Sequence, residues 1–425
     1  MRVLITAAGS YGDVAPYTGL GARLREAGHD VALATQETFA PLVRAAGLTL
    51  RPLPADPHAS GGGSGGKREL LRAAASFVRE LGSGLVDAAE HGGGPDVLLL
   101  STTTAPLGWQ LAEAMGVPTL GVYLQPTHPT REFAPVVSGA RSLGGPGNRA
   151  MGRFSLRMTD RVYADAVRDL RSRLGLPAAA PGAVRRRREE ARWPVLHGFS
   201  PAVVPRPGDW RDGLDVVGNW WPHHDPGRPL PAAHEDFLRA GPPPVFIGFG
   251  SMAAGEGERL SEIAVAALRK AGLRGVLQEG RAGLMAYGDD ILTVDEVPHA
   301  LLFPRMAAVV HHAGAGTTAA ALRAGVPAIP VPVMADQPFW AARVAALGAA
   351  TTPIPFKHLT AERLAEQLGG AVREDSLKAA AGGIARRMGA EDGAGHVLKA
   401  VEGLGAPRRG AGNCATSHDT AADER

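Results

Sequence analysis

The chain has 425 residues, which is more than a single hydrophobic core usually organises, so we expect two or three domains. Hydrophobic residues make up 45% and charged residues 20% of the sequence, a balance that excludes wholesale disorder and a coiled-coil rod. The 45 Lys and Arg residues barely outnumber the 42 Asp and Glu residues, and this formal charge of +3 does not favour nucleic acid as a partner.

The sequence contains one cysteine, Cys414, which excludes an intrachain disulfide and a metal site built from cysteines. This fits a reducing compartment, and we expect a cytoplasmic protein. The apolar stretch 3–8 is shorter than the core of a signal peptide, and no run approaches the ~18 apolar residues of a membrane span. We therefore expect neither export nor a transmembrane helix.

The N-terminal half alternates between short apolar runs and helical stretches, with glycine or proline between them. This alternation predicts a doubly wound α/β fold. The predicted strands are 3–8, 31–34, 97–100 and 119–123, and the predicted helices are 15–27 and 108–115.

The same alternation begins again at residue 245, so we expect a second lobe of the same class. The stretch before it, 201–244, is rich in proline and tryptophan and predicts a hinge. The predicted strands of the second lobe are 245–249, 275–278, 308–311 and 328–331, with helices over 259–271 and from Thr317. The expected domains are 1–210, a linker 211–244, a second domain 245–404 and a disordered tail 405–425.

Two further segments have unusual composition. The segment 60–66 is almost entirely Gly and Ser, and we expect a mobile loop without chemistry there. Four arginines at 185–188 precede two glutamates, a pattern that favours a solvated helix face with i,i+4 ion pairs. The alternative is a patch for transient contact with a membrane surface.

The segment that follows the predicted strand ending at His311 has the composition of an anion-binding turn. Its small residues leave the backbone bare, and the next helix points its positive end at the turn. This pattern suits a diphosphate, although a close-packed turn capped by Thr317 would have the same composition. The residues of this turn are Ala313, Gly314, Ala315, Gly316, Thr317 and Thr318.

Asp336 and Gln337 follow the next predicted strand at its carboxyl end, where ligands bind in open α/β sheets. A carboxylate beside an amide suits the vicinal hydroxyls of a sugar. The alternative is a turn in which Asp336 caps the helix that holds Phe339 and Trp340.

Four segments resemble family 1 glycosyltransferases, in particular the branch that acts on sterols and antibiotic aglycones. HHAGAGTT at 311–318 and the later pair Asp336-Gln337 are similar to HHGGAGT and DQ in that branch. GSYGDVAPY at 9–17 resembles its GSRGDVQPY opening, GFGSM at 248–252 resembles its first C-lobe loop, and the stretch 297–312 matches as well.

The resemblance implies a GT-B fold, in which two Rossmann-like lobes face a central cleft and no metal or other cofactor takes part. It implies an N-terminal lobe for the acceptor and a C-terminal lobe for the nucleotide sugar. It places Ser251, His312, Gly314, Ala315, Gly316 and Thr317 at the donor diphosphate, Asp336 and Gln337 at the donor sugar, and the backbone of Val297 at the base.

Inverting transfer needs a base on the acceptor hydroxyl, and Asp13 occupies the position of the aspartate that this branch uses. An N-cap role for Asp13 is the structural alternative. Ser10 and Gly12 shape the same loop. His128 either lines the acceptor pocket or is a solvent-exposed loop residue.

Because of three departures from the family pattern, the nucleotide of the donor sugar could be either UDP or dTDP. Ala313 replaces a glycine, Arg281 stands where relatives often have tryptophan, and Glu296 stands where plant enzymes carry the tryptophan that stacks on uracil.

The sequence thus predicts an inverting, metal-independent enzyme that moves a hexose, glucose first, from a UDP- or dTDP-sugar to a hydroxyl of a hydrophobic small molecule. The alternatives are a noncatalytic nucleotide-sugar-binding partner of another transferase and an NAD-dependent oxidoreductase. The loop at 8–13 lacks the Gly-x-Gly-x-x-Gly expected of the latter.

Overall fold

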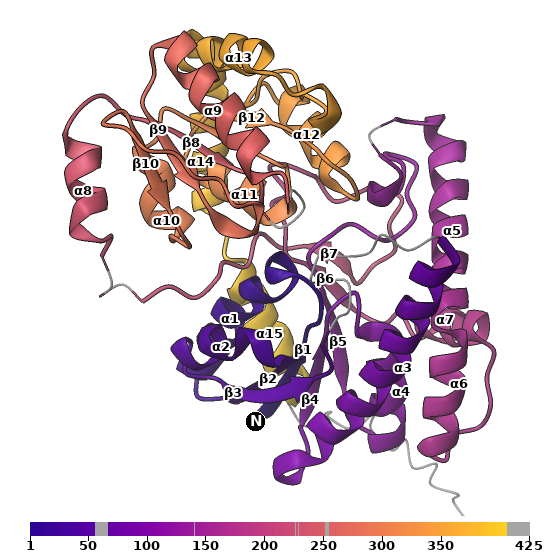
Figure 1. Cartoon of the computed structure of the whole chain (residues 1–425). Helices are drawn as coiled ribbons and strands as arrows, with labels where there is room; N and C mark the ends of the chain where they lie inside the picture. Colours follow the sequence, from indigo (N-terminus) through magenta and orange to yellow (C-terminus); the bar gives the residue numbers. More distant parts are fainter. Residues whose placement is uncertain (56–66, 140, 226, 228, 251–254, 406–425) are drawn as a thin grey trace, which may run out of the picture.

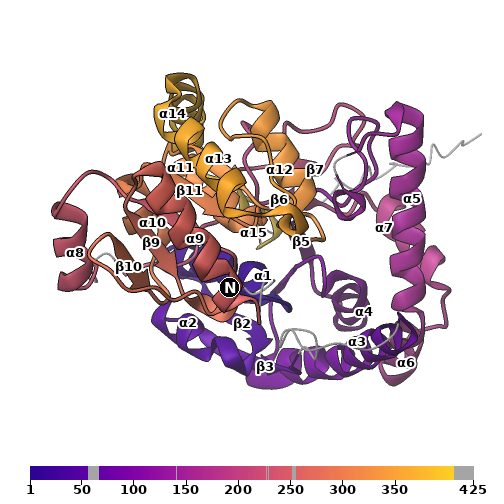
Figure 2. The ribbon, with the colours of Figure 1, turned by 45° about the horizontal axis from the view of Figure 1, so that its top comes forward.

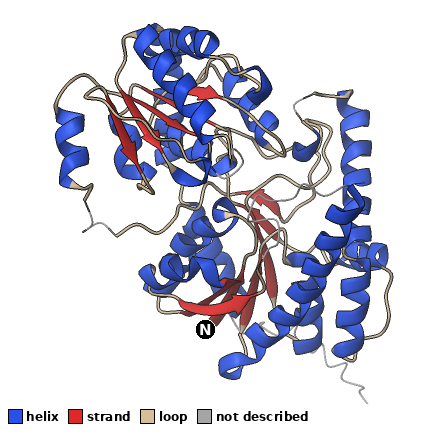
Figure 3. Ribbon diagram, viewed as in Figure 1, coloured by secondary structure: helices blue, strands red, loops and turns tan. Residues whose placement is uncertain are grey.

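The computed structural model describes residues 1–55, 67–139, 141–225, 227, 229–250 and 255–405. Two lobes are each built on a parallel sheet with helices on its faces (Figure 1, Figure 3). Ser251, the segment 60–66, Cys414 and the expected tail from 406 lie outside the described residues. Among the helices that are described, none has both the length and the apolar composition needed to cross a membrane.

The N-terminal lobe holds a seven-stranded sheet in the order β3-β2-β1-β4-β5-β6-β7, with every pair parallel. Its central strands are continuous apolar runs because helices cover both faces. The strands are β1 (Arg2–Thr6), β2 (Asp30–Gln36), β3 (Thr49–Leu53), β4 (Val97–Leu100), β5 (Thr119–Tyr123), β6 (Val195–His197) and β7 (Leu214–Val216). The helices are α1 (Tyr11–Glu26), α2 (Ala40–Ala45), α3 (Lys67–Glu90), α4 (Ala105–Met115), α5 (Gly144–Val162), α6 (Ala164–Arg173) and α7 (Pro181–Glu190).

The C-terminal lobe holds a five-stranded parallel sheet in the order β10-β9-β8-β11-β12. Its strands are β8 (Val245–Gly248), β9 (Gly275–Gln278), β10 (Ile291–Val294), β11 (Ala308–His311) and β12 (Ala328–Pro330). The remaining helices are α8 (Ala232–Arg239), α9 (Gly257–Ala271), α10 (His299–Leu302), α11 (Ala315–Arg323), α12 (Gln337–Ala346), α13 (Ala361–Arg373), α14 (Asp375–Gly389) and α15 (Gly393–Gly405).

The two Rossmann-like sheets confirm the predicted fold class, and β4, β5, β9 and β11 have the predicted bounds. The helices begin earlier than predicted, because α1 starts at Tyr11 rather than near residue 15, and α11 starts at Ala315 rather than at Thr317. Both turns before these helices are therefore shorter, and the residues predicted to lie in them belong to first helical turns.

The lobe boundaries differ from the expected domains in three places. β7 and α8 both fall inside the expected linker: β7 extends the N-terminal sheet, and Leu238 of α8 packs in a core cluster of the C-terminal lobe. The last helix, α15, returns to the N-terminal lobe and lies beside α1 (Figure 1). Val397 and Val401 pack there with Tyr17, and Trp220 Nε1 donates to the carbonyl of Gly393 at 3.1 Å.

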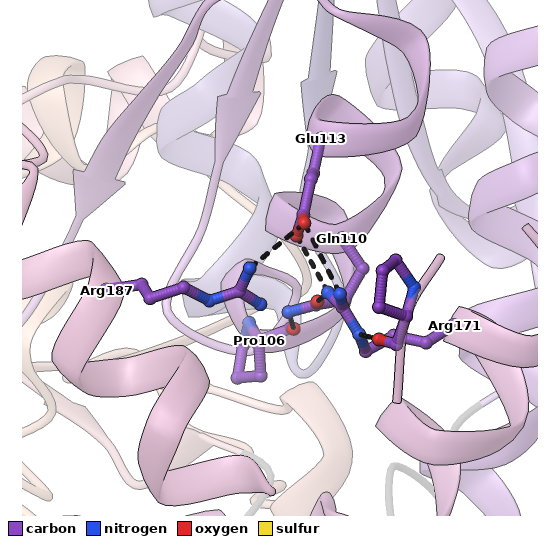
Figure 4. Close-up of polar contacts among 6 residues, drawn as sticks. Pro106, Gln110, Glu113, Arg171 and Arg187 are labelled. Carbon is purple, nitrogen blue, oxygen red and sulfur yellow. Dashed lines mark hydrogen bonds and ion pairs between the residues drawn. The ribbon is translucent and has the colours of Figure 1, made fainter. Parts of the chain in front are cut away.

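Helix α7 is fixed against α4 by ion pairs, so its arginines are not a simple solvated face. Arg187 donates to Glu113 at 3.1 Å, and the buried Arg171, 1% exposed, donates to Glu113 at 2.7 Å and to Gln110 (Figure 4). Arg185 on the next face of the helix pairs with Asp160 of α5 at 2.9 Å. The Arg185–Asp160 pair holds α5 and α7 side by side at the edge of the lobe (Figure 2).

Candidate active site

The turn between β1 and α1 is closed by Asp13. Asp13 is the third residue of the helix, and its Oδ2 accepts from the Ser10 N–H at 2.9 Å and from the Ser10 hydroxyl at 2.7 Å. The N-cap of α1 is Ser10, so the alternative prediction that Asp13 is the N-cap is wrong. Asp13 still stabilises the start of the helix, as the third residue of a capping box. Gly9 has φ +141°, and a Cβ there would lie 2.7 Å from Asp13 Oδ2, so only glycine fits.

Asp13 lies close enough to the C-terminal lobe for its charge to act on Asp336. The pKa of Asp336 is raised, mainly by burial and further by the negative charge of Asp13. Tyr11, in the same first turn of α1, has a pKa raised by burial and by the charge of Glu296 from the C-terminal lobe. The first turn of α1 therefore lies near the C-terminal lobe, and Asp13 in this turn is half-buried.

The turn after β11 holds backbone N–H groups for which the described residues provide no helical acceptor. Ala313 has φ +62° and is fully buried, and Gly314 is the N-cap of α11. The first hydrogen bond of the helix runs from the Thr318 N–H to the Gly314 carbonyl at 3.0 Å, so the preceding N–H groups have no acceptor in the helix. These donors and the positive end of the helix dipole form the anion-binding geometry that the composition of the turn suggested.

Two adjacent histidines have different surroundings at this turn. His311 is fully buried, and its Nδ1 accepts from the Ala313 N–H at 3.0 Å, which fixes the turn. His312 is half-buried, and its ring lies against two glycines, since a Cβ on Gly250 would lie 2.9 Å from its Cε1 and a Cβ on Gly314 2.5 Å from its Nε2. Burial lowers the pKa of His312 to about 4, so it is a neutral hydrogen-bonding group at pH 7.

Asp336 and Gln337 begin α12, next to the N-terminal lobe. Asp336 Oδ2 accepts from Trp340 Nε1 at 2.8 Å and from Gln125 Nε2 of the N-terminal lobe at 2.9 Å. Gln337 Oε1 accepts from the Val333 and Met334 N–H groups at 2.8 and 3.2 Å, and its Nε2 has no hydrogen bond among the described residues. The pair thus closes its own loop and keeps polar atoms at the lobe junction.

The remaining donor-side positions are less informative. Val297 is half-buried against the core of the C-terminal lobe, just before Pro298, the N-cap of the short helix α10. Ser251 and the side chain of Arg281 lie outside the described residues. Among the residues that are described, no three His, Cys, Asp or Glu side chains are arranged to hold a metal ion.

The N-terminal lobe contains a cavity of about 280 Å³ between the loop after β5 and helices α5 and α7. His128 lines it and is half-buried, so its interpretation as a solvent-exposed loop residue is wrong. No sequence motif marks the helical walls of this cavity, so the sequence did not predict them. Other lining residues are Tyr123, Gln125, Phe133, Val136, Leu156, Asp160, Val167, Arg185, Arg188 and Trp193.

Comparison with known proteins identifies the family. Residues 275–404 match the model of the erythromycin biosynthesis protein CIII-like C-terminal domain, and residues 3–89 match the glycosyltransferase family 28 N-terminal domain. Over 95% of its length the chain is 36% identical to an O-mycaminosyltylonolide 6-deoxyallosyltransferase from Streptomyces fradiae, and it covers 97% of that protein. The chain belongs to this nucleotide-sugar glycosyltransferase family.

The glycosyltransferase is also 32% identical, over 94% of its length, to a sterol 3-beta-glucosyltransferase of Arabidopsis thaliana, of which it spans only 65%. Among solved structures, glycosyltransferase VinC in complex with dTDP has a TM-score of 0.65 and 24% identity, covering 95% of this chain and all (100%) of that one. This likeness confirms the GT-B architecture expected from the four segments.

Proposed function

We propose that the glycosyltransferase transfers a hexose, with inversion, from a dTDP- or UDP-sugar to a hydroxyl of a hydrophobic natural-product aglycone or sterol-like lipid. The observation that carries this proposal is the position of Asp13, whose carboxylate is held by Ser10 and acts on Asp336 across the lobe junction. The activities of the Streptomyces and plant relatives, on a macrolide and on sterols, support this acceptor class.

The donor would bind with its diphosphate at the N–H groups of Gly314, Ala315, Gly316 and Thr317, with His312 and Ser251 beside it. Asp336 and Gln337 would hold sugar hydroxyls, which supports glucose as the first donor to test. The backbone of Val297 would meet the base. The dTDP bound by the structurally similar VinC favours a thymine base.

In the transfer step, a carboxylate oxygen of Asp13 takes the proton of the acceptor hydroxyl, and the oxygen of that hydroxyl attacks the anomeric carbon of the sugar. The bond from that carbon to the diphosphate oxygen breaks, and the nucleoside diphosphate leaves with the electron pair. The helix dipole and backbone donors of α11 stabilise the charge that develops on it. Ser10 and Gly12 shape the loop that holds Asp13.

One end of the acceptor would occupy the cavity lined by His128, which lies between helices of the N-terminal lobe, and its reacting hydroxyl would extend beyond the cavity to Asp13. We propose the cytoplasm as the place of reaction, on the compositional ground of a single cysteine.

Asp13→Asn tests the assignment. The amide keeps an oxygen for Ser10 but takes up no proton, so we expect turnover to fall by about 10²-fold or more while dTDP affinity stays within about twofold. Product formation from dTDP-glucose or UDP-glucose with a panel of hydrophobic alcohols is measured by mass spectrometry, and nucleotide affinity by calorimetry. Asp375→Asn, in the first turn of α14, is the matched control. Unchanged turnover in Asp13→Asn would remove Asp13 from this role.

The same assays separate the alternatives. A noncatalytic nucleotide-sugar-binding partner would bind nucleotide without forming product on any acceptor, and an oxidoreductase would bind NADH tightly without competition from dTDP or UDP.

A further inference from the structure

His128 forms a hydrogen-bonded pair with a second histidine behind the cavity. His128 Nδ1 lies 3.3 Å from Nε2 of His197, the last residue of β6. His197 Nδ1 lies 2.9 Å from the backbone carbonyl of Asp215 on β7. His197 is fully buried and its ring stacks on Trp210 with a centroid distance of 4.6 Å, so the pair is rigidly held.

The sequence of contacts from Asp215 through His197 to His128 determines which ring nitrogen of each histidine carries a proton. A carbonyl oxygen only accepts, so His197 Nδ1 carries a proton and donates it to Asp215. Burial lowers the pKa of His197 well below its ordinary value, so the neutral ring has no second proton and its Nε2 accepts. His128 Nδ1 must then be the donor of the pair. Burial lowers the pKa of His128 to about 3, so its ring is neutral and its Nε2 carries no proton.

The unprotonated Nε2 of His128 remains available to a ligand. Nε2 has no hydrogen bond to any described residue. It is not among the buried side-chain atoms that lack a partner, and His128 itself lines the cavity. Tyr123 stacks beside the ring with a centroid distance of 5.9 Å, and Trp210 meets it edge-on. An apolar ligand would leave this acceptor unpaired in a largely apolar wall, which costs free energy.

We propose that His128 Nε2 accepts a hydrogen bond from a second hydroxyl of the acceptor, distinct from the hydroxyl that receives the sugar. Asp13 and the donor-side residues do not line this cavity, so a hydroxyl at His128 is an anchor and not the reacting group. His128 thereby selects hydroxylated acceptors over equally hydrophobic ones without a donor. That the cavity's occupant is the sugar acceptor rests on the proposed function; the hydrogen bond itself does not.

The tautomer is tested directly by NMR of protein labelled with ¹⁵N-histidine at pH 7. We expect the His128 signal, assigned by its loss in His128→Phe, to show a protonated Nδ1 and an unprotonated Nε2. A protonated Nε2, in either the other tautomer or the imidazolium, would overturn the proposal. This measurement uses the wild-type chain and does not depend on whether the variant binds ligand.

Ligand selection is tested with 2-naphthol and 2-methoxynaphthalene. The first has a hydroxyl group that can donate a hydrogen bond, and in the second a methyl group replaces the hydroxyl proton. We expect the wild-type protein to bind 2-naphthol about fivefold more tightly, and His128→Phe to bring the two dissociation constants within about twofold of each other. His358→Phe, an exposed histidine of the C-terminal lobe, should keep the wild-type ratio. Equal binding of both probes by the wild type, a preserved ratio in His128→Phe, or no binding of either at 1 mM would each overturn the proposal.

Neither measurement includes a nucleotide sugar. A failed transfer assay with an intact naphthol preference would count against the proposed function alone. Loss of the preference with intact transfer would count against the anchor alone.

Discussion

Two alanines beside the donor-side residues have left-handed backbone conformations. Ala313, before the N-cap of α11, has φ +62°, and Ala335, before Asp336, has φ +57°. Such a conformation costs a residue with a side chain roughly 1–2 kcal/mol, and it persists where neighbours hold it in place. At Ala313, the hydrogen bond from its N–H to His311 Nδ1 holds the conformation in place. Strain at both of these turns is what a preorganised binding site would show, in line with the proposed donor site.

Gly314→Ala is expected to weaken donor binding. The added Cβ would lie 2.5 Å from His312 Nε2, so the imidazole must move away from its place at the turn. We expect dTDP affinity, measured by calorimetry, to fall by at least about tenfold, which corresponds to 1.4 kcal/mol.

The control for this substitution is Gly389→Ala at the end of α14, where a new Cβ meets nothing within 4 Å. It should leave nucleotide affinity unchanged. If Gly314→Ala also bound dTDP as the wild type does, His312 would not be a donor contact.

The sequence alone could predict the residues at the two turns but not their geometry. Glycines and small residues mark a turn whichever residue begins the helix, so the predicted starts at residue 15 and Thr317 lie later than the actual starts at Tyr11 and Ala315. The environment of His128 could not be predicted either, because its neighbours His197 and Trp210 lie about 70 to 80 residues further along the chain.

At the scale of elements, the cavity depends on how α7 is held. Its arginines make ion pairs to α4 and α5, and Arg188 also lies over the Trp193 ring, with 5.7 Å from its Cζ to the ring centroid. The strands β4 and β5 could be predicted because they are unbroken apolar runs bounded by turns. α5 begins with Gly-Gly-Pro-Gly-Asn, which is turn composition, so its helical conformation is a tertiary effect.

Glu113→Ala should destabilise the N-terminal lobe. The variant leaves the buried guanidinium of Arg171 without its carboxylate, although Gln110 and the Pro177 carbonyl still accept from it. We expect the free energy of unfolding, from urea denaturation, to fall by about 3 kcal/mol, the lower end for breaking a buried ion pair. Asp87→Ala, which removes the exposed pair with Arg173, should cost less than about 1 kcal/mol. Equal losses in both variants would contradict a special role for Glu113.

The ion pair between Glu113 and Arg171 also predicts that the free energy of unfolding depends on pH. Hydrogen bonding from Arg171 lowers the pKa of Glu113, so the stability it contributes is present above the pKa of the unfolded chain and is lost as the pH falls through the folded-state pKa. The stability difference between wild type and Glu113→Gln should therefore shrink between about pH 6 and about pH 3. A difference that stays constant over this range would mean that the carboxylate is not charged in the folded protein.

At the scale of the whole molecule, the lobes are joined by specific contacts as well as by the chain. Gln125 donates to Asp336, Arg343 donates to the Val203 carbonyl, and the rings of Phe133 and Phe339 lie 5.3 Å apart. Gln125 also lines the cavity, so one side chain contacts both the proposed acceptor pocket and the proposed sugar-binding carboxylate. Sequence periodicity predicts each lobe but carries no information about these pairings between them.

Val397→Asp should destabilise the N-terminal lobe although residue 397 follows the whole C-terminal sheet. The new carboxylate would be buried without a partner against Tyr17 and its neighbours, at a cost of about 3 kcal/mol or more. Lys399→Asp, on the exposed side of α15, should change the free energy of unfolding by less than about 0.5 kcal/mol.

Hydrogen exchange locates the effect of Val397→Asp. Exchange should accelerate in α1 before it does in α9 or α13. Faster exchange confined to the C-terminal helices would mean that α15 does not stabilise the lobe it lies on.

The return of α15 to the first lobe has a consequence for making chimaeras of this enzyme. A fusion with a single crossover in the segment between β7 and α8 would place a foreign α15 on the native α1, where Val397, Val401 and the Gly393 carbonyl must match Tyr17 and Trp220. Exchange of donor specificity between relatives therefore requires two junctions, the second near residue 391, so that the recipient keeps its own final helix.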